Sequence, residues 1–128
     1  MKRLQDWQSL YPRLLAAAEE ATILVEGKRD ALAVADLGLG SAVLLNQGKS
    51  LVQLADDLAQ GGRPVELLMD WDRTGNDRQA RLRSILIGQI PVRETIRLGL
   101  MAWAQTPFVE EIQRELEGVR RRAADGYI

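Results

Sequence analysis

Three short apolar runs, each followed by a turn and a helical pattern, constrain the fold of this chain more than any other feature. Residues 22–25, 42–45 and 65–69 are short runs rich in Val, Leu and Ile, and only the third contains a charged residue, Glu66. Such runs are typical of strands buried on both faces, as in parallel sheets. The sequence therefore predicts an α/β protein with a small parallel sheet of three or four strands sandwiched between helices.

Helical periodicity fills the segments around these runs. Apolar residues recur at helical spacing over residues 6–20, with Asp6 as the expected N-cap, and again over residues 30–37. Ser50 is expected to cap a third helix. A polar, arginine-rich helix is expected to follow the run at residues 65–69.

After Gly88 the pattern is mostly helical, with two helices expected within residues 92–123. The segment Gln89-Ile90, just before Pro91, is the one candidate for a fourth strand. We expect a single domain over residues 1–128, whose core spans about residues 22–88 and whose terminal helices are extensions.

The composition removes several classes of chemistry. The chain has 17 Lys and Arg against 18 Asp and Glu, a net charge of −1, and neither His nor Cys. Thiol nucleophiles, disulfides, Cys/His zinc sites and histidine acid–base catalysis are therefore excluded. No apolar run approaches the ~20 residues that span a bilayer. We expect no membrane partner, and a cytoplasmic location.

Acidic residues follow two of the three apolar runs. Glu26 follows the first, and Asp70 and Asp72 follow the third. Because ligands of open parallel sheets bind beyond the carboxyl ends of the strands, these acids would converge if the first and third strands are neighbours. Strand alternation would point Asp70 and Asp72 the same way. Clustered carboxylates need a cation among them, and Mg²⁺ suits one or two carboxylates with bound phosphate.

These residues resemble the Toprim domain of primases, topoisomerases, OLD-type nucleases and the bacterial 5S ribosomal RNA maturase. The resemblance covers about half the chain and is closest to the small stand-alone Toprim proteins and the maturase. It is carried by Ile23-Leu24-Val25-Glu26-Gly27-Lys28-Arg29-Asp30 and by Asp70-Trp71-Asp72-Arg73-Thr74-Gly75.

The resemblance implies a role for each matching acid. Glu26 would be the general acid or base of phosphodiester chemistry, Asp70 and Asp72 would hold Mg²⁺ or Mn²⁺, and Asp30 would bind a second metal. Asp30 is equally interpreted as a first-turn acid that complements its helix dipole. Topoisomerases usually carry a third acid where this chain has Thr74.

The loop at residues 46–50 is a candidate phosphate site. It is not a P-loop, because the required first glycine is replaced by Val43. Backbone N–H groups of a turn entering a helix still bind phosphate, and a plain turn is the alternative. Gly48 and Lys49 are the candidate contacts here, together with Lys28 of the first motif.

Charge is unevenly distributed along the chain. Residues 1–72 hold 7 basic and 11 acidic residues, whereas residues 73–128 hold 10 and 7. Arg73, Arg78 and Arg81 follow the Asp pair directly, which predicts a track for a phosphate backbone, although such arginines are often only a solvated face. Trp71 is expected to point away from the acids into the core.

The favoured function is a Mg²⁺-dependent nuclease acting on structured RNA rather than DNA. One alternative is a non-catalytic Toprim module that binds nucleic acid or protein, and a protein partner would then supply specificity. A primase- or topoisomerase-related subunit is the third hypothesis. It is disfavoured because the tyrosines, Tyr11 and Tyr127, lie in terminal segments.

Overall fold

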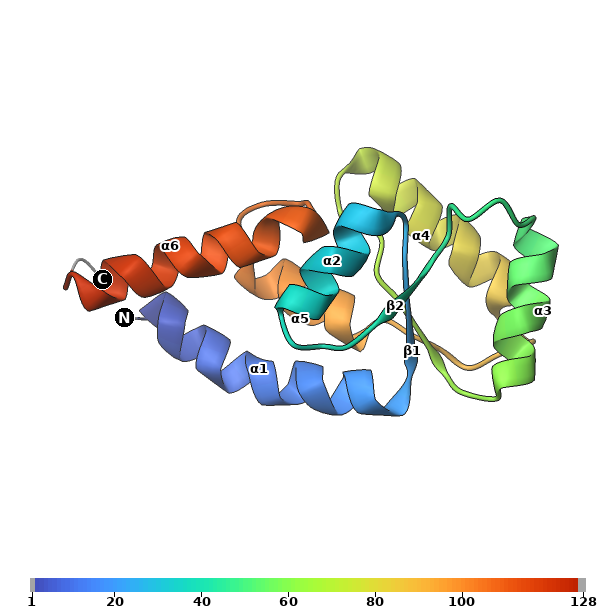
Figure 1. Cartoon of the computed structure of the whole chain (residues 1–128), viewed down its shortest axis with the longest axis horizontal. Coiled ribbons are helices and arrows are strands. Elements are labelled where there is room, and N and C mark those ends of the chain that lie inside the picture. Colours follow the sequence, from blue (N-terminus) through green and yellow to red (C-terminus); the bar gives the residue numbers. More distant parts are fainter. Residues whose placement is uncertain (1, 127–128) are drawn as a thin grey trace.

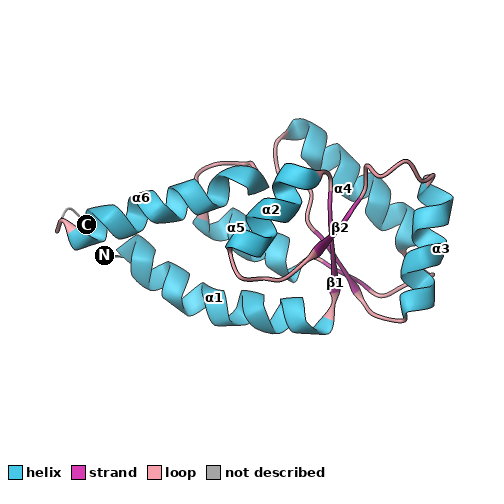
Figure 2. Ribbon diagram, in the orientation of Figure 1, coloured by secondary structure: helices cyan, strands magenta, loops and turns pink. Residues whose placement is uncertain are grey.

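The computed structural model describes residues 2–126 and shows a four-stranded sheet flanked by helices (Figures 1 and 2). The strands are β1 (Thr22–Val25), β2 (Ala42–Leu44), β3 (Val65–Leu67) and β4 (Val92–Arg93). The helices are α1 (Lys2–Glu20), α2 (Lys28–Asp36), α3 (Leu51–Gly61), α4 (Arg73–Leu86), α5 (Thr95–Trp103) and α6 (Ile112–Ala124), with a 3₁₀ turn, η1 (Val109–Glu111), before α6. The predicted α/β class is confirmed.

All strands are parallel, in the order β2-β1-β3-β4. The first and third strands are therefore neighbours, as expected, and Leu24 lies opposite Leu67. Beyond the last ladder pairs, the amide of Leu68 donates to the carbonyl of Leu24 at 2.9 Å. This topology brings the residues that follow β1 and β3 to the same edge of the sheet.

The sheet separates two hydrophobic cores, because successive strand residues point to opposite faces. Ile23 and Val25 pack with α1, α2, α5 and α6, whereas Leu24 packs with α3 and α4. Ile96, Leu100 and residues of α6 are buried in the same core as α2. Of the C-terminal helices, α5 contacts the sheet at β3, whereas α6 packs against α1 and α2 and extends away from the sheet (Figure 1).

The fourth strand is not where the sequence pattern placed it. It is formed by Val92 and Arg93, which were expected in a helix, whereas Gln89-Ile90 forms no strand. The amide of Val65 donates to the carbonyl of Pro91 at 2.9 Å and starts the ladder. A strand of two residues is too short for alternation to reveal it.

Two helix beginnings illustrate what local sequence encodes. Ser50 caps α3 as predicted, its hydroxyl accepting from the amide of Gln53 at 3.2 Å. In contrast, Asp6 is not an N-cap, because α1 already begins at Lys2. The extra turn brings Arg3 to Glu115 and to the carbonyl of Trp103, contacts that lie about a hundred residues apart in the chain.

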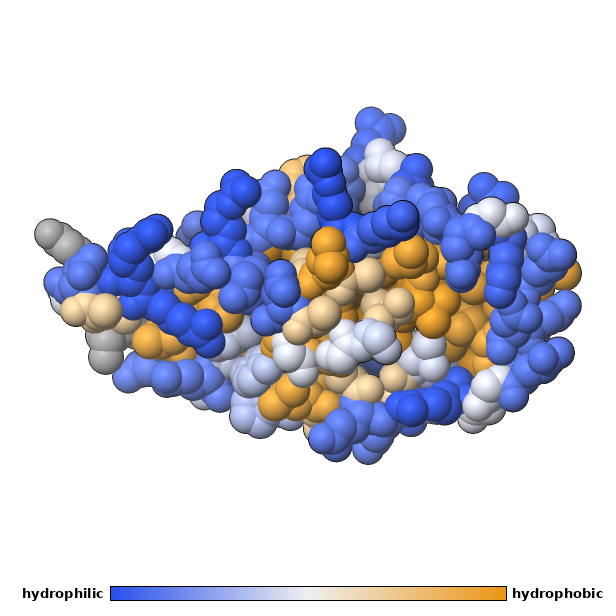
Figure 3. Space-filling view, in the orientation of Figure 1, coloured by the Kyte–Doolittle hydropathy of each residue, from blue (hydrophilic) through white to orange (hydrophobic). Residues whose placement is uncertain are grey.

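An apolar surface lies where β2 forms an edge of the sheet. The three residues of β2 are half-buried, and Leu32 and Val52 on the flanking helices are 64% and 70% exposed. Figure 3 shows apolar side chains in the middle of this face, bordered by hydrophilic helices. Within residues 2–126, none of the helices has both the length and the apolar character needed to cross a membrane.

Candidate active site at the carboxyl edge of the sheet

Polar residues follow the strands at the carboxyl edge of the sheet. Glu26 comes after β1, Asn46 lies in the loop after β2, Asp70 comes shortly after β3, and Glu94 follows β4. The amide of Asn46 donates to the carbonyl of Glu26 at 3.1 Å, so the loop at residues 46–50 begins beside β1. Glu26, Asp70 and the start of the loop at residues 46–50 thus lie at one edge of the sheet, whereas Lys49 lines a cavity with Thr22 and Gly61.

Asp70 is half-buried at the centre of this edge. Its Oδ1 accepts a hydrogen bond from the amide of Val109 at 2.8 Å. Burial raises the pKa of the Asp70 carboxyl, the Val109 hydrogen bond lowers it, and the nearby carboxylates of Asp30, Asp72 and Glu110 raise it further. The structure therefore brings Asp70 into electrostatic contact with three other acids.

Asp72 is also the N-cap of α4. Its Oδ1 accepts from the amide of Gly75 at 2.8 Å. Gly75 is buried, and a Cβ at this position would lie 2.1 Å from the carbonyl oxygen of Asp70. The absence of a side chain at Gly75 therefore lets the first turn of α4 pack directly on the Asp70 main chain.

Asp30 lies in the first turn of α2, as one of its two interpretations from sequence expected. Its Oδ2 accepts from the amide of Gly27 at 3.2 Å, which closes the first turn of α2. Burial raises the pKa of Asp30, the Gly27 hydrogen bond lowers it, and the charge of Glu110 raises it. Asp30 therefore both stabilises a helix end and faces the acids at this edge.

The acids do not form a ready-made metal cage. Within residues 2–126, no three side chains of the types His, Cys, Asp and Glu are grouped closely enough to hold a metal ion. The donor set consists of carboxylate oxygens, which suit Mg²⁺. This ion usually takes only one or two carboxylates from the protein and completes its shell with water and substrate phosphate.

Glu26 forms an ion pair with Arg78 of α4. The two side chains are 25% and 45% exposed, so the pair lies at the surface of the candidate site. Arg78 was predicted only as part of a phosphate track. In this structure it neutralises the acid that was predicted to move protons.

The other predicted phosphate contacts are exposed side chains or exposed backbone. Lys28, Arg73 and Arg81 are all exposed. Gly48 is exposed as well, in the left-handed conformation (φ 79°) that favours glycine. Lys49 is held by an ion pair with Asp57 of α3 at 2.5 Å. The amine of Lys49 is thus engaged by the helix that follows it.

Trp71 is partly buried and packs against the core that contains α2 and α5, as predicted. Its amide donates to the carbonyl of Pro107 at 2.9 Å. Together with the hydrogen bond from Val109 to Asp70, this contact joins the loop after β3 to the loop before η1.

The sequence pattern missed several residues that support Asp70. Arg97 and Gln79 are buried, and both hydrogen-bond the backbone between Leu67 and Asp70. Glu110 is a further acid near Asp70, and its charge raises the pKa of Asp70. One signal was present for Arg97: it lies three residues before the buried Leu100, on the apolar side of a helix.

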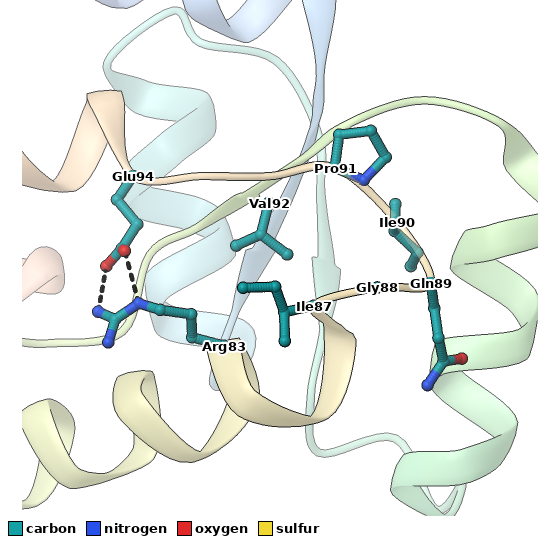
Figure 4. A pocket seen from close by; sticks show the side chains of 8 residues that line it. All are labelled: Arg83, Ile87, Gly88, Gln89, Ile90, Pro91, Val92 and Glu94. Atoms are coloured by element: carbon teal, nitrogen blue, oxygen red, sulfur yellow. Dashed lines mark hydrogen bonds and ion pairs between the residues drawn. The ribbon is translucent and has the colours of Figure 1, made fainter.

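Gln79 also links this support to a cavity beside β4. Its Nε2 donates to Glu94 at 2.8 Å, and Glu94 forms a bidentate pair with Arg83 (Figure 4). This pairing and the Gln79 bond lower the pKa of Glu94. The cavity has a volume of about 450 Å³ and is lined by Arg83, Ile87, Gly88, Gln89, Ile90, Pro91, Val92 and Glu94.

Fold and site define a small α/β protein with carboxylates at the carboxyl edge of a parallel sheet. The chain is 32% identical over 103 residues to a UPF0292 protein of Methanosarcina barkeri, covering 76% of this chain and 72% of that protein. It is 33% identical over 105 residues to a UPF0292 protein of Pyrococcus furiosus, covering 80% and 79%. The chain therefore belongs to the UPF0292 family.

A solved structure shares the fold. It is described as a putative protein from Aquifex aeolicus, has 30% sequence identity and superposes with a TM-score of 0.70. The similarity covers 81% of this chain and 95% of the other. No family model matches this chain.

Proposed function

We propose that this chain is a cytoplasmic, Mg²⁺-dependent phosphodiesterase of the Toprim type, a nuclease whose preferred substrate is structured RNA. The observation that carries the proposal is the parallel pairing of β1 with β3, which brings Asp70 and Asp72 to the carboxyl edge of the sheet, where Asp30 and Asp72 raise the pKa of Asp70. Glu26 follows the strand next to β3, on the same edge. The preference for RNA rests on the resemblance to the maturase.

The hydrogen bonds of the acids support a metal role for specific oxygens. The Oδ1 atoms of Asp70 and Asp72 are engaged by the amides of Val109 and Gly75. We assign the Oδ2 atoms of both residues to the metal, with Asp30 as the candidate for a second ion. When bound, Mg²⁺ supplies Lewis-acid polarisation of the phosphodiester.

Glu26 is assigned the proton transfer. A chain without His and Cys leaves carboxylates as its main acid–base groups near neutral pH. Glu26 would accept the proton of the attacking water or return one to the leaving oxygen. Arg78 would orient the Glu26 carboxylate through their ion pair until substrate phosphate competes for the guanidinium.

Nucleic acid is the proposed substrate because exposed cations surround the acids. Lys28 lies at the start of α2, and Arg73 and Arg81 lie on α4, which follows the Asp pair. Arginine presents a planar fork of donors that matches phosphate oxygens. Contacts of this kind position a backbone without reading its sequence.

The proposal is tested by incubating the purified chain with labelled pools of RNA and DNA. Each pool is combined with Mg²⁺, with Mn²⁺ or with a chelator. We expect metal-dependent cleavage, faster on structured RNA. Glu26→Gln should reduce it on the order of 10²-fold while binding survives. Glu117→Gln, an exposed position on α6, is the matched control and should leave the rate unchanged.

Three results would count against the proposal. Cleavage that persists in the chelator would remove the metal role. Undiminished cleavage by Glu26→Gln would show that Glu26 has the wrong role. Binding of both pools without cleavage under any metal would favour the non-catalytic module.

A further inference from the structure

Arg97 is a buried arginine on α5, only 5% exposed, that faces the loop after β3. Burying a guanidinium is costly unless its donors are satisfied. Here the Nε donates to the carbonyl of Met69 at 2.9 Å, and one terminal nitrogen donates to the carbonyl of Asp70 at 2.8 Å. The same nitrogen donates to the side-chain oxygen of Asn76 at 2.6 Å.

These three acceptors belong to two different segments of the chain. Met69 and Asp70 lie in the loop after β3, whereas Asn76 lies in the first turns of α4. The guanidinium therefore joins the main chain of Asp70 to the helix whose N-cap is Asp72. The two predicted metal-binding acids are thus linked through one side chain.

Gln79 holds the other side of the same loop. Its Oε1 accepts from the amide of Met69 at 3.2 Å, and its Nε2 donates to the carbonyl of Leu67 at 3.2 Å. The backbone leaves the ladder after Leu67, so buried side chains take over the hydrogen bonds that a neighbouring strand would make. Asp70 consequently lies in a loop that is held by hydrogen bonds from two buried side chains.

We propose that Arg97 is the positioning residue of the candidate site, fixing the Asp70 main chain so that the carboxylate stays on the Val109 amide and beside Asp72. Its function in metal binding rests on the function proposed above, whereas its hold on Asp70 does not. Lysine cannot replace it, because a single ammonium lacks the planar fork that reaches both carbonyls and Asn76 together.

The first measurement needs no metal. The Val109 amide donates to Asp70 Oδ1, so its hydrogen-exchange rate reports whether the carboxylate is in place. We expect the Val109 amide to exchange about tenfold faster or more in Arg97→Lys than in a control variant whose thermal stability equals that of Arg97→Lys. Arg63→Gln is the matched control, because the Arg63 guanidinium also donates to main-chain carbonyls, those of Glu19 and Ala21, which precede the amino end of β1.

The second measurement is Mn²⁺ affinity, followed by electron paramagnetic resonance. Groups that orient metal ligands typically contribute about 10–100-fold to affinity, so Arg97→Lys should weaken Mn²⁺ binding by about this factor and Arg63→Gln should not. A wild type that binds no Mn²⁺ would refute the proposed function, and the exchange rate alone would then decide the role of Arg97.

Arg97 would lose its assigned role if the Val109 exchange rate and the Mn²⁺ affinity of Arg97→Lys equalled those of the Arg63→Gln control. If Arg97→Lys fails to fold, the same two measurements are made on Asn76→Ala. It removes one exposed acceptor and leaves the buried guanidinium in place. We expect smaller changes in the same direction, and unchanged exchange and affinity in Asn76→Ala would overturn the proposal.

Discussion

Arg78 of α4 forms an ion pair with Glu26, so the helix that follows the Asp pair neutralises the acid at the end of the neighbouring strand. Because both side chains are partly exposed, Arg78→Gln should change the free energy of unfolding by about 1 kcal/mol or less. If Arg78 orients Glu26, cleavage should fall on the order of tenfold, which is the scale for groups that orient a site.

Arg78→Lys is the matched variant for that measurement, since it keeps the charge and should retain more activity than Arg78→Gln. Cleavage rates and denaturant unfolding are compared for the same preparations. Equal cleavage rates for the wild type and Arg78→Gln would show that the ion pair does not orient Glu26.

Asp70→Asn should stabilise the protein at neutral pH. The pKa of Asp70 is raised in the folded state, mainly by burial, so ionisation of this group opposes folding once the pH rises through that pKa. An Asn side chain keeps an acceptor for the Val109 amide without the charge. We expect a melting temperature higher by a few degrees at pH 7, and no difference from wild type below the ordinary Asp pKa of about 3.9.

Thermal unfolding across pH checks this expectation, with Asp56→Asn on the exposed face of α3 as the control. A wild type that is more stable than Asp70→Asn at pH 7 would contradict the assigned direction.

Mg²⁺ should raise the melting temperature of the wild type and leave Asp70→Asn/Asp72→Asn unaffected. A ligand at a hundredfold excess over its Kd contributes about 2.7 kcal/mol. Asn is as good an N-cap as Asp, so the double variant retains the start of α4 and differs chiefly in its charge. An identical response to Mg²⁺ in both proteins would place the metal elsewhere.

Arg73→Gln/Arg81→Gln should flatten the salt dependence of nucleic-acid binding. Each phosphate contact to a single strand contributes about 0.7 to the slope of log K against log salt, so the double variant should lose about 1.4. Arg121→Gln/Arg122→Gln, exposed near the end of α6, provides a control of equal charge change. The same loss of slope in both variants would indicate a general effect of charge, and would contradict specific phosphate contacts by Arg73 and Arg81.

Gly75→Ala should destabilise the protein by about 1–3 kcal/mol, the usual cost of overpacking, because its Cβ would meet the Asp70 carbonyl at 2.1 Å. Gly61→Ala, in the last turn of α3 with open space around it, should be neutral or stabilising. Denaturant unfolding separates the two. If Gly75→Ala is as stable as the wild type, the loop after β3 moves to accommodate the added methyl group without loss of unfolding free energy.

The strands at residues 22–25 and 42–44 and the Ser50 cap were predictable because each depends on neighbours in the sequence. Arg97 was not, because its role depends on carbonyls 27 and 28 positions away, which no periodicity reports. Asp70 was found as a candidate because strand ends in parallel sheets meet at one edge. Its hydrogen-bond donor, Val109, could be found only from the folded chain.

Two of the groups that hold Asp70, Arg97 and the amide of Val109, come from the chain after residue 88. A fragment ending there would keep Glu26, Asp70 and Asp72, yet would lose both of these contacts. The acidic motifs transferred to another protein as a strand, turn and helix alone would therefore lack these two contacts. Among homologues, replacements at position 97 should accompany changes in the loop after β3, and insertions before η1 should be rare.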